Sequence, residues 1–296
     1  MPEFTISYNP ATGEEIGKTS VTTVEELKEI ADKAKTAAEQ WAEVPVRERI
    51  DKIRRIRRYI LDNTDSLAEI ISRDNGKTRV DAMGAEIAPA AMAVSYYCDN
   101  AERFLKDRSM GVGNIALCFK RTKAVNAPYG VIGIISPWNY PFCIPFYQIV
   151  MGLLAGNAIL FKAATETQMV GNFLRECIET AGLPAGVFNC VNMPGRIAGD
   201  AFLEAGIGKL FFTGSCEAGK YLMRKAADTL TPVCLELGGN DAMIVCEDAN
   251  LDRAANCVMW AGFGNGGQSC GGIERIYVQE KVYDKFLDKL KCVCNR

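Results

Sequence analysis

Apolar residues recur at helical spacing through the first hundred residues of the chain, with polar and charged residues between them. One helix is expected to begin at Thr23, which stands three residues before Glu26 as in a capping box. The segment 46–63 carries isoleucines on one face and arginines on the other, and we interpret its basic run as a solvated helix face. Asn75-Gly76 suits a left-handed helix cap, and a long helix is expected over 78–106.

Short apolar runs alternate with helical patterns from residue 130 onward. The glycine-rich stretch 111–127, which precedes them, is expected to form a pair of strands or an extended arm. Apolar runs that alternate with helices predict a parallel sheet covered by helices on both faces. The fold class is therefore α/β, with a Rossmann-like parallel sheet and a helical N-terminal region. The runs expected to be strands are 131–136, 158–164, 186–193, 209–214, 231–237 and 241–247.

Composition and charge argue against several classes of protein. The net charge of -2 gives no basic surface for nucleic acid or an anionic membrane. The first residues lack the pattern of a secretory signal, and the twelve cysteines include no C-x-x-C pair, so we expect reduced thiols in the cytoplasm. Residues 124–161 carry no charge and are long enough to span a bilayer, but their prolines and amides favour a buried segment of a soluble protein.

The chain contains no histidine. This excludes a Ser-His-Asp triad, a Cys-His dyad and a histidine metal site, and no metal is expected. A general base must then be a carboxylate, a lysine, a tyrosine or a thiolate.

Loops rich in glycine, serine or threonine follow the expected strands. The sequences SPWNYP, FTGSCEAG and ELGGN come directly after three of them, where the ligand of an open parallel sheet lies. Several of these loops begin a helix and could bind a pyrophosphate through backbone N–H groups. The usual G-x-G-x-x-G fingerprint is absent, so the loops alone indicate only a nucleotide-type ligand with an atypical loop.

Four motifs taken together resemble the aldehyde dehydrogenase superfamily. They are PWNYP at 137–141, FTGS at 212–215, LELGG at 235–239 and FGNGGQSC at 263–270, in the order found in that family. The resemblance covers essentially the whole chain. It implies oxidation of a small-molecule aldehyde to a carboxylic acid with NAD or NADP, by a protein that is a homo-oligomer in its full-length form.

The resemblance also implies roles for particular residues. Cys270 matches the nucleophile, Glu236 the general base, and Asn139 a side-chain donor to the oxyanion, with the backbone N–H of Cys270 as second donor. Lys162 matches a residue that binds the adenosine ribose region. The residues implied to contact the cofactor are Ser136, Pro137, Trp138, Lys162, Thr165, Glu166, Gly195, Gly199, Phe212, Thr213, Gly214, Ser215, Leu237 and Gly238.

A structural interpretation stays open for each principal residue. Cys270 could be an inert buried thiol, Glu236 a partner in a salt bridge, Asn139 a turn residue and Lys162 a surface lysine. An unpaired carboxylate at Glu236 would be costly in an apolar strand end. The other cysteines are expected to be structural, although Cys143 follows PWNYP closely enough to approach the site.

The resemblance divides the chain into parts. Residues 1–113 and 129–236 are expected to form a dinucleotide-binding domain, 114–128 the strands of an oligomerisation arm, and 237–296 the start of a second α/β catalytic domain. Members of the family continue beyond the position of Arg296, so we expect a chain that is truncated relative to them. It could then be an enzyme once completed, or a catalytically incompetent nucleotide-binding module or partner subunit.

Two further expectations concern chemistry. Many NAD-preferring members carry a glutamate three positions after the residue matching Lys162, where this chain has Thr165. A neutral residue does not repel a 2′-phosphate, so NADP is expected to be tolerated. Transfer of the acyl group to coenzyme A is an alternative to hydrolysis, and Glu236 argues against it.

Overall fold

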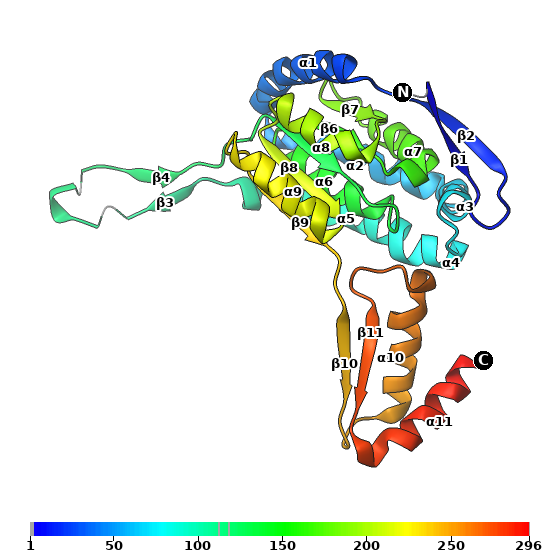
Figure 1. Ribbon diagram of the computed structural model, residues 1–296. Coiled ribbons are helices and arrows are strands. Elements are labelled where there is room, and N and C mark those ends of the chain that lie inside the picture. Colours follow the sequence, from blue (N-terminus) through cyan, green and yellow to red (C-terminus); the bar gives the residue numbers. More distant parts are fainter. Residues whose placement is uncertain (1–2, 112, 118, 296) are drawn as a thin grey trace.

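The computed structural model describes residues 3–111, 113–117 and 119–295. Figure 1 shows a large body of sheet and helices, a long hairpin that projects from it, and a smaller second body at the C-terminal end. The N-terminal strands β1 (Phe4–Tyr8) and β2 (Glu15–Ser20) pair antiparallel at one side of the large body.

The large body is built on a five-stranded parallel sheet with the order β7-β6-β5-β8-β9. Its central strands β5 and β6 are buried at every position, which explains their largely apolar sequences, and the buried Lys162 at the end of β6 is the one charged residue in them. The predicted α/β fold with a parallel sheet is confirmed. The strands are β5 (Val131–Ile135), β6 (Ala158–Lys162), β7 (Phe188–Val191), β8 (Lys209–Gly214) and β9 (Val233–Leu237).

Helices cover both faces of this sheet. On one face α1, α8 and α9 pack against residues such as Val131 and Leu160, and on the other α2, α3, α5, α6 and α7 pack against residues such as Ile134 and Phe161. The alternation of strand side chains between the two clusters follows from the period of two along a strand. The helices are α1 (Val24–Glu43), α2 (Val46–Asp62), α3 (Thr64–Asn75), α5 (Ala88–Leu105), α6 (Cys143–Leu154), α7 (Gln168–Glu179), α8 (Gly195–Glu204) and α9 (Cys216–Ala227).

Local signals in the sequence are found where they were expected. The Thr23 hydroxyl accepts a hydrogen bond from the Glu26 backbone N–H at 3.1 Å, and the Glu26 carboxylate accepts one from the Thr23 N–H at 2.8 Å. This is the capping box at the start of α1. Gly76 closes α3 with a φ of 87°, in the left-handed region that glycine tolerates.

The long helix expected over 78–106 is interrupted. It begins as α4 (Arg79–Asp81), widens into the π-helical turn η1 (Ala82–Ile87), and continues as α5. Pro89 supplies a reason, because it has no N–H to donate to the carbonyl of Ala85. A helical pattern of apolar residues does not distinguish a π turn from an α turn.

The projecting hairpin consists of β3 (Arg108–Met110) and β4 (Thr122–Ala124), which pair antiparallel. Its first strand therefore begins before the stretch 111–127 that was expected to hold both strands. Gly113 has a φ of 62° and lies beyond that strand, towards the tip. The tip also contains the short 3-10 turn η2 (Ile115–Leu117).

The second body contains β10 (Asp241–Val245) and β11 (Ile273–Val278), which form a separate parallel pair. The helices α10 (Leu251–Phe263) and α11 (Tyr283–Cys294) pack on this pair around a small core. The run 241–247 is thus a strand, but it does not extend the large sheet. The remaining 3-10 turns are η3 (Thr165–Thr167), η4 (Gly264–Gly267) and η5 (Glu280–Val282).

In the part of the chain that the structure describes, no helix combines the length and apolar character needed to cross a membrane.

Candidate active site

A pocket of about 670 Å³ lies at the carboxyl ends of β5, β8 and β9. The strand order changes direction between β5 and β8, because β6 and β7 follow β5 on one side while β8 and β9 lie on the other. Ligands of open parallel sheets bind at such a switch point. The pocket therefore lies where the sequence placed it.

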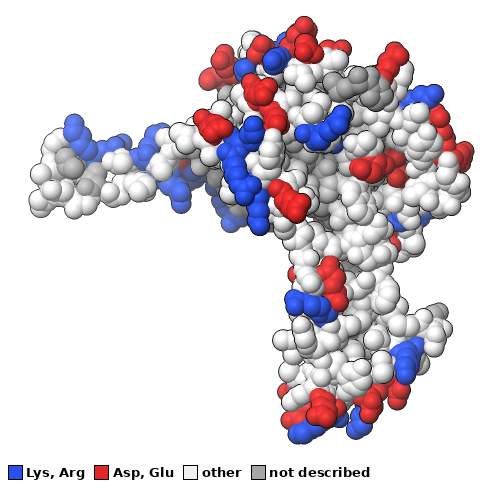
Figure 2. Space-filling view, in the orientation of Figure 1, with Lys and Arg blue, Asp and Glu red and all other residues white. Residues whose placement is uncertain are grey.

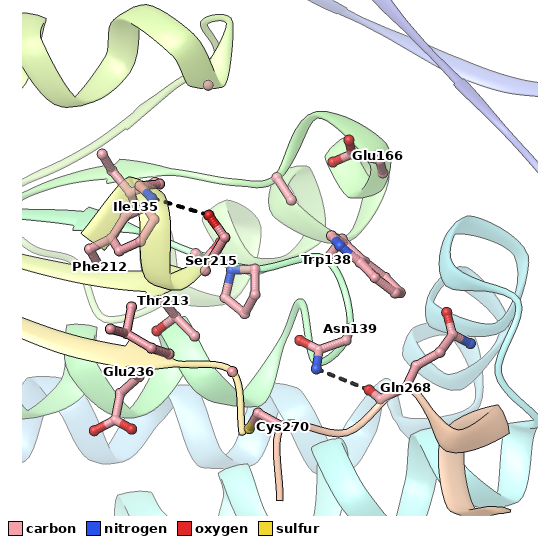
Figure 3. Close-up of a pocket in the computed structure, with 18 of the residues that line it drawn as sticks. Ile135, Trp138, Asn139, Glu166, Phe212, Thr213, Ser215, Glu236, Gln268 and Cys270 are labelled. Carbon is pink, nitrogen blue, oxygen red and sulfur yellow. Dashed lines mark hydrogen bonds between the residues drawn. The ribbon is translucent and has the colours of Figure 1, made fainter. Parts of the chain in front are cut away.

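Nearly all of the residues predicted for the site line this one pocket. They include Asn139, Glu236 and Cys270, together with every expected cofactor contact except Gly199. In Figure 3, Asn139, Gln268 and Cys270 lie together at one end of the pocket, and Phe212 and Ser215 lie towards the other. The lining residues that sequence reasoning missed are Ile135, Ala164, Ala218, Gly239, Gln268, Ser269 and Glu274.

Gly199 lies outside the pocket lining. A Cβ at this position would come within 2.2 Å of the Leu222 side chain, so the glycine allows α8 and α9 to pack closely. A packing role in the helix pair accounts for this glycine.

One end of the pocket suits an anion. Ser215 caps α9 by accepting a hydrogen bond from the Ala218 N–H at 3.2 Å, and both residues line the pocket, so the N-terminus of α9 faces it. Backbone N–H groups and the dipole at a helix N-terminus favour negative charge. Gly195, the first residue of α8, lines the same pocket.

Lys162 and Thr213 add polar groups to the lining of the pocket. The Lys162 side chain is buried, and burial lowers its pKa, while the charge of the Glu166 carboxylate acts in the opposite direction. The buried Oγ1 of Thr213 has no hydrogen-bond partner among the described residues. A buried ammonium, an unpartnered hydroxyl and a helix N-terminus together fit the phosphates and ribose hydroxyls of a dinucleotide.

The other end of the pocket joins the two bodies of the molecule. The side-chain Nδ2 of Asn139 donates a hydrogen bond to the Gln268 carbonyl at 3.0 Å, two residues before Cys270 (Figure 3). Asn265 Nδ2 donates to the carbonyls of Asn139 at 2.9 Å and of Gln268 at 3.1 Å. The loop after β5 and the loop that carries Cys270 are therefore held against each other.

The glycines before Cys270 are required by the path of the backbone. Asn265, Gly266 and Gly267 have φ values of 55°, 64° and 77°, so three consecutive residues adopt the left-handed region. Side chains with a branched Cβ would be strained there. The resulting turn at the end of α10 brings Cys270 into the pocket lining.

Cys270 differs from the buried cysteines of the chain. Its side chain is exposed at the pocket, whereas Cys143 and Cys177 are buried and burial raises the pKa of both thiols. A buried thiol with a raised pKa stays protonated and is a poor nucleophile. Cys143 does not line the pocket, although it follows PWNYP.

Glu236 does not occupy the apolar setting that its sequence suggested. It lies on β9, the edge strand of the sheet, and its side chain is exposed. An edge strand has a neighbour on one side only, so the apolar residues around Glu236 in the sequence do not enclose it. Figure 3 shows Glu236 on the strand that passes beside Cys270.

The sequence profile described as the aldehyde dehydrogenase family matches residues 3–295. The chain belongs to this family. The resemblance found in the four motifs is therefore confirmed across almost the whole chain.

Relatives with known activities are similar over the same range. The chain is 36% identical over 284 residues to a glutarate-semialdehyde dehydrogenase of Pseudomonas aeruginosa, covering 96% of this chain and 58% of the relative. It is 34% identical to the NADP-dependent succinate-semialdehyde dehydrogenase of Escherichia coli, with coverage of 96% and 58%. The chain thus spans little more than half the length of these aldehyde dehydrogenases.

Solved structures of the family share the fold. The crystal structure of succinate-semialdehyde dehydrogenase from Burkholderia pseudomallei matches with a TM-score of 0.93 and 32% identity, covering 98% of this chain and 59% of that one. Both the parallel sheet and the second body of this chain therefore have counterparts in the family.

Proposed function

We propose that this chain carries the dinucleotide-binding and nucleophile-bearing parts of an enzyme that oxidises an aldehyde to a carboxylic acid. The observation that carries the proposal is the bond between Asn139 Nδ2 and the Gln268 carbonyl, which holds a side-chain donor next to the loop of Cys270, an exposed cysteine of the pocket lining. Membership of the family supports the same chemistry.

Cys270 attacks the aldehyde in the first step. Its thiolate forms a bond to the carbonyl carbon, and the carbonyl oxygen becomes an alkoxide. The second hydrogen of Asn139 Nδ2 and the backbone N–H of Cys270 stabilise this charge, as in an oxyanion hole. The product of the step is a thiohemiacetal on Cys270.

When bound, NAD or NADP would supply the acceptor for the hydride that leaves the thiohemiacetal on Cys270, which leaves a thioester on that residue. Lys162, Thr213 and the N-terminus of α9 would hold its phosphate and ribose groups at the other end of the pocket. Thr165 stands where a glutamate would repel a 2′-phosphate, and the relative from Escherichia coli is named for NADP. We therefore propose that NADP is accepted as well as NAD.

Glu236 acts as general base in the last step. Its carboxylate takes a proton from a water molecule, which attacks the thioester carbon and releases the carboxylic acid and the Cys270 thiolate. A carboxylate base is consistent with a chain that lacks histidine. Semialdehydes are the substrates named for two of the relatives, so we propose a small aldehyde of this kind as the substrate.

The proposal is tested with the chain itself. Isothermal titration with NADP and NAD measures binding, and the absorbance of the reduced cofactor measures turnover of succinate semialdehyde. Binding of a dinucleotide together with aldehyde-dependent reduction supports the proposal. Absence of both contradicts it.

Two alternatives give different results in the same experiment. A nucleotide-binding module or partner subunit binds NADP but produces neither reduced cofactor nor a thioester on Cys270, which intact-mass measurement detects. A CoA-acylating enzyme requires coenzyme A for turnover. Exposed Glu236 in the pocket lining favours hydrolysis over transfer to coenzyme A.

The projecting hairpin bears on the oligomeric state of the protein, and the cysteines bear on its cellular compartment. Ile115 and Phe119 at the tip of the hairpin are 89% and 73% exposed, which supports a role of this arm in a homo-oligomer. Lys and Arg side chains lie along the same arm (Figure 2). Buried cysteines such as Cys98, Cys143 and Cys177 are free thiols, consistent with a reducing compartment such as the cytoplasm.

A further inference from the structure

Side chains from residues 75–86 hold the backbone of the loop that carries Asn139. Asn75 Nδ2 donates to the Trp138 carbonyl at 2.7 Å, and Lys77 Nζ donates to the Asn139 carbonyl at 2.8 Å. Glu86 Oε2 accepts hydrogen bonds from the N–H groups of Phe142 at 2.8 Å and Cys143 at 3.2 Å. This short segment thus satisfies backbone groups along the whole loop from β5 to α6.

Lys77 and Glu86 form a completely buried ion pair. Lys77 Nζ lies 2.5 Å from Glu86 Oε1, and neither side chain is exposed to solvent. The Lys77 ammonium also lies 4.3 Å from the centre of the Tyr140 ring. A buried pair contributes little net stability compared with apolar residues of similar size, because both charges are desolvated. Stability alone therefore does not explain why charges occupy this position.

The π-helical turn η1 carries Glu86. Such turns are rare and are often found at functional sites. The Glu86 carboxylate lies at the N-terminus of α6, where the helix dipole favours a negative charge. Phe142, the N-cap residue of α6, makes no capping hydrogen bond with its own side chain, so Glu86 serves as the cap. The Lys77 ammonium pairs with this carboxylate, and a second of its three N–H donors is directed at the Asn139 carbonyl.

The contacts continue from this loop to the nucleophile. The Asn139 carbonyl accepts from both Lys77 and Asn265, and the Asn139 side chain donates to the Gln268 carbonyl. Lys77 is thus linked to the segment two residues before Cys270 through a single residue, Asn139. The second body meets the first through this contact.

We propose that the buried Lys77–Glu86 pair positions Asn139 and, through it, the loop that carries Cys270. Lys77 and Glu86 are positioning residues, since neither lines the pocket. The importance of this placement for catalysis rests on the proposed function, in which Asn139 stabilises the oxyanion. The placement itself is a property of the chain and is measured without turnover.

A purely structural role for the pair would give a different result. If the pair only fills the core and caps α6, replacing both charges by neutral groups of similar size restores the protein, since no unpaired charge is left. If Lys77 positions Asn139 through its hydrogen bond, the same replacement restores stability but leaves the loop of Cys270 loosely held. Stability and loop position therefore separate the two roles.

The test compares Lys77→Met with the double variant Lys77→Met/Glu86→Gln. Thermal unfolding measures stability, and hydrogen exchange followed by mass spectrometry measures the loop. The reporters are the N–H groups of Gln268 and Gly272, which are bonded to the carbonyls of Asn265 and Ser269. Asp74→Asn is the matched control, because Asp74 is a buried carboxylate that accepts the Val170 N–H at the start of α7 instead of α6.

We expect Lys77→Met to lower the unfolding temperature and to speed exchange over 268–272. In the double variant the unfolding temperature recovers, while exchange over 268–272 stays about tenfold faster than in the unmodified chain, as for loss of one good hydrogen bond. Asp74→Asn leaves exchange in this loop unchanged. Recovery of loop exchange together with stability in the double variant would overturn the proposal, as would equal acceleration in Asp74→Asn.

Asn139→Ala provides a second route if the Lys77 variants do not fold. It removes the bond to the Gln268 carbonyl but keeps the Glu86 bonds to α6. Faster exchange over 268–272 with unchanged exchange at 142–143 supports the link through Asn139, and unchanged exchange over 268–272 refutes it. Hydrogen exchange is measured without dinucleotide binding or turnover, so these results test the positioning proposal even if the proposed aldehyde oxidation is not observed.

Discussion

The two bodies of the molecule differ in how their strands are buried. β5 and β6 of the first body are buried at every position, whereas β10 and β11 of the second leave most of their residues exposed or half-buried. Large apolar residues such as Ile244 and Trp260 are 73% and 82% exposed in the second body. Figure 2 shows that much of its visible face carries no charged side chain.

The pocket is lined by residues of both bodies. The residues proposed to hold the dinucleotide lie at the ends of strands that have core clusters on both faces. Cys270, the proposed nucleophile, lies on a small body whose core contains few residues, and the bond from Asn139 to the Gln268 carbonyl joins its loop to the first body. The proposed binding groups and the proposed nucleophile therefore lie on bodies with cores of different size, and single substitutions are expected to affect them separately.

Cys270→Ala is expected to have the largest effect. It removes the nucleophile, so aldehyde-dependent reduction of the cofactor falls by about 10⁴-fold or more. NADP affinity measured by titration stays within about twofold, because the binding groups lie on the first body. Cys257→Ala, an exposed cysteine of α10, is the matched control and keeps its activity. Full activity in Cys270→Ala would show that the chemistry lies elsewhere.

A pair of core substitutions compares the two scaffolds directly. Phe161→Ala in β6 leaves a cavity in a completely buried site and is expected to cost about 3 to 5 kcal/mol of unfolding free energy. Phe286→Ala in α11 removes a side chain that is 3% exposed and is expected to cost about 3 kcal/mol, at the low end of the same range, because the small core of the second body can collapse further around the gap. Denaturant titrations measure both values, and equal costs would contradict the proposed difference in packing.

Asp74 makes the stability of the first body depend on pH. Burial raises the pKa of its carboxyl from an ordinary value of 3.8 to about 6, so the folded chain holds a proton that the unfolded chain releases. Stability contributed by this group is therefore lost as pH rises from about 4 to above 6.

Asp74→Asn removes this dependence. Relative to the unmodified chain, its unfolding free energy should rise by about 2 to 3 kcal/mol between pH 4 and pH 7, at about 1.4 kcal/mol for each pKa unit. The matched control is Asp65→Asn, since Asp65 lies on the same helix but is exposed. A difference that does not change with pH would show that Asp74 is not held protonated by burial.

Thr165→Glu is expected to have the smallest effect. A carboxylate here repels a 2′-phosphate, so NADP affinity falls about tenfold, or ~1.4 kcal/mol, while NAD affinity is kept. Alkylation of Cys270 proceeds at an unchanged rate, since the second body is untouched. Thr122→Glu on the arm adds the same charge away from the pocket and leaves both affinities unchanged. Equal loss for NAD and NADP would mean that Thr165 does not face the 2′ position.

Much of the first body could be predicted from the sequence. The capping box at Thr23, the cap at Gly76 and the buried runs of β5 and β6 are local patterns, and the structure contains each of them. The π turn at 82–87 and the early start of the hairpin at Arg108 were not predicted. Both depend on small differences in backbone hydrogen bonding that apolar spacing does not record.

The sequence also identified many of the residues that line the pocket, but not all of their contacts. The four motifs supplied Cys270, Asn139 and Glu236, and all three line one pocket. The sequence missed Gln268 as the partner of Asn139, and it assigned Gly199 to the cofactor although that glycine packs against Leu222. A motif identifies residue types, but it does not state which side chain faces which neighbour.

Most helices and strands of the first body follow from local periodicity and capping in the sequence, and the absence of histidine follows from its composition. The family came from the resemblance of four motifs. The strand order β7-β6-β5-β8-β9, the exposure of Glu236 on the edge strand and the buried Lys77–Glu86 pair beside Asn139 arise only in the folded chain. Lys77 and Asn139 are 62 residues apart in the chain. Their contact arises because packing of the helical region against the sheet brings distant backbone and side-chain groups together, and no local pattern encodes that packing.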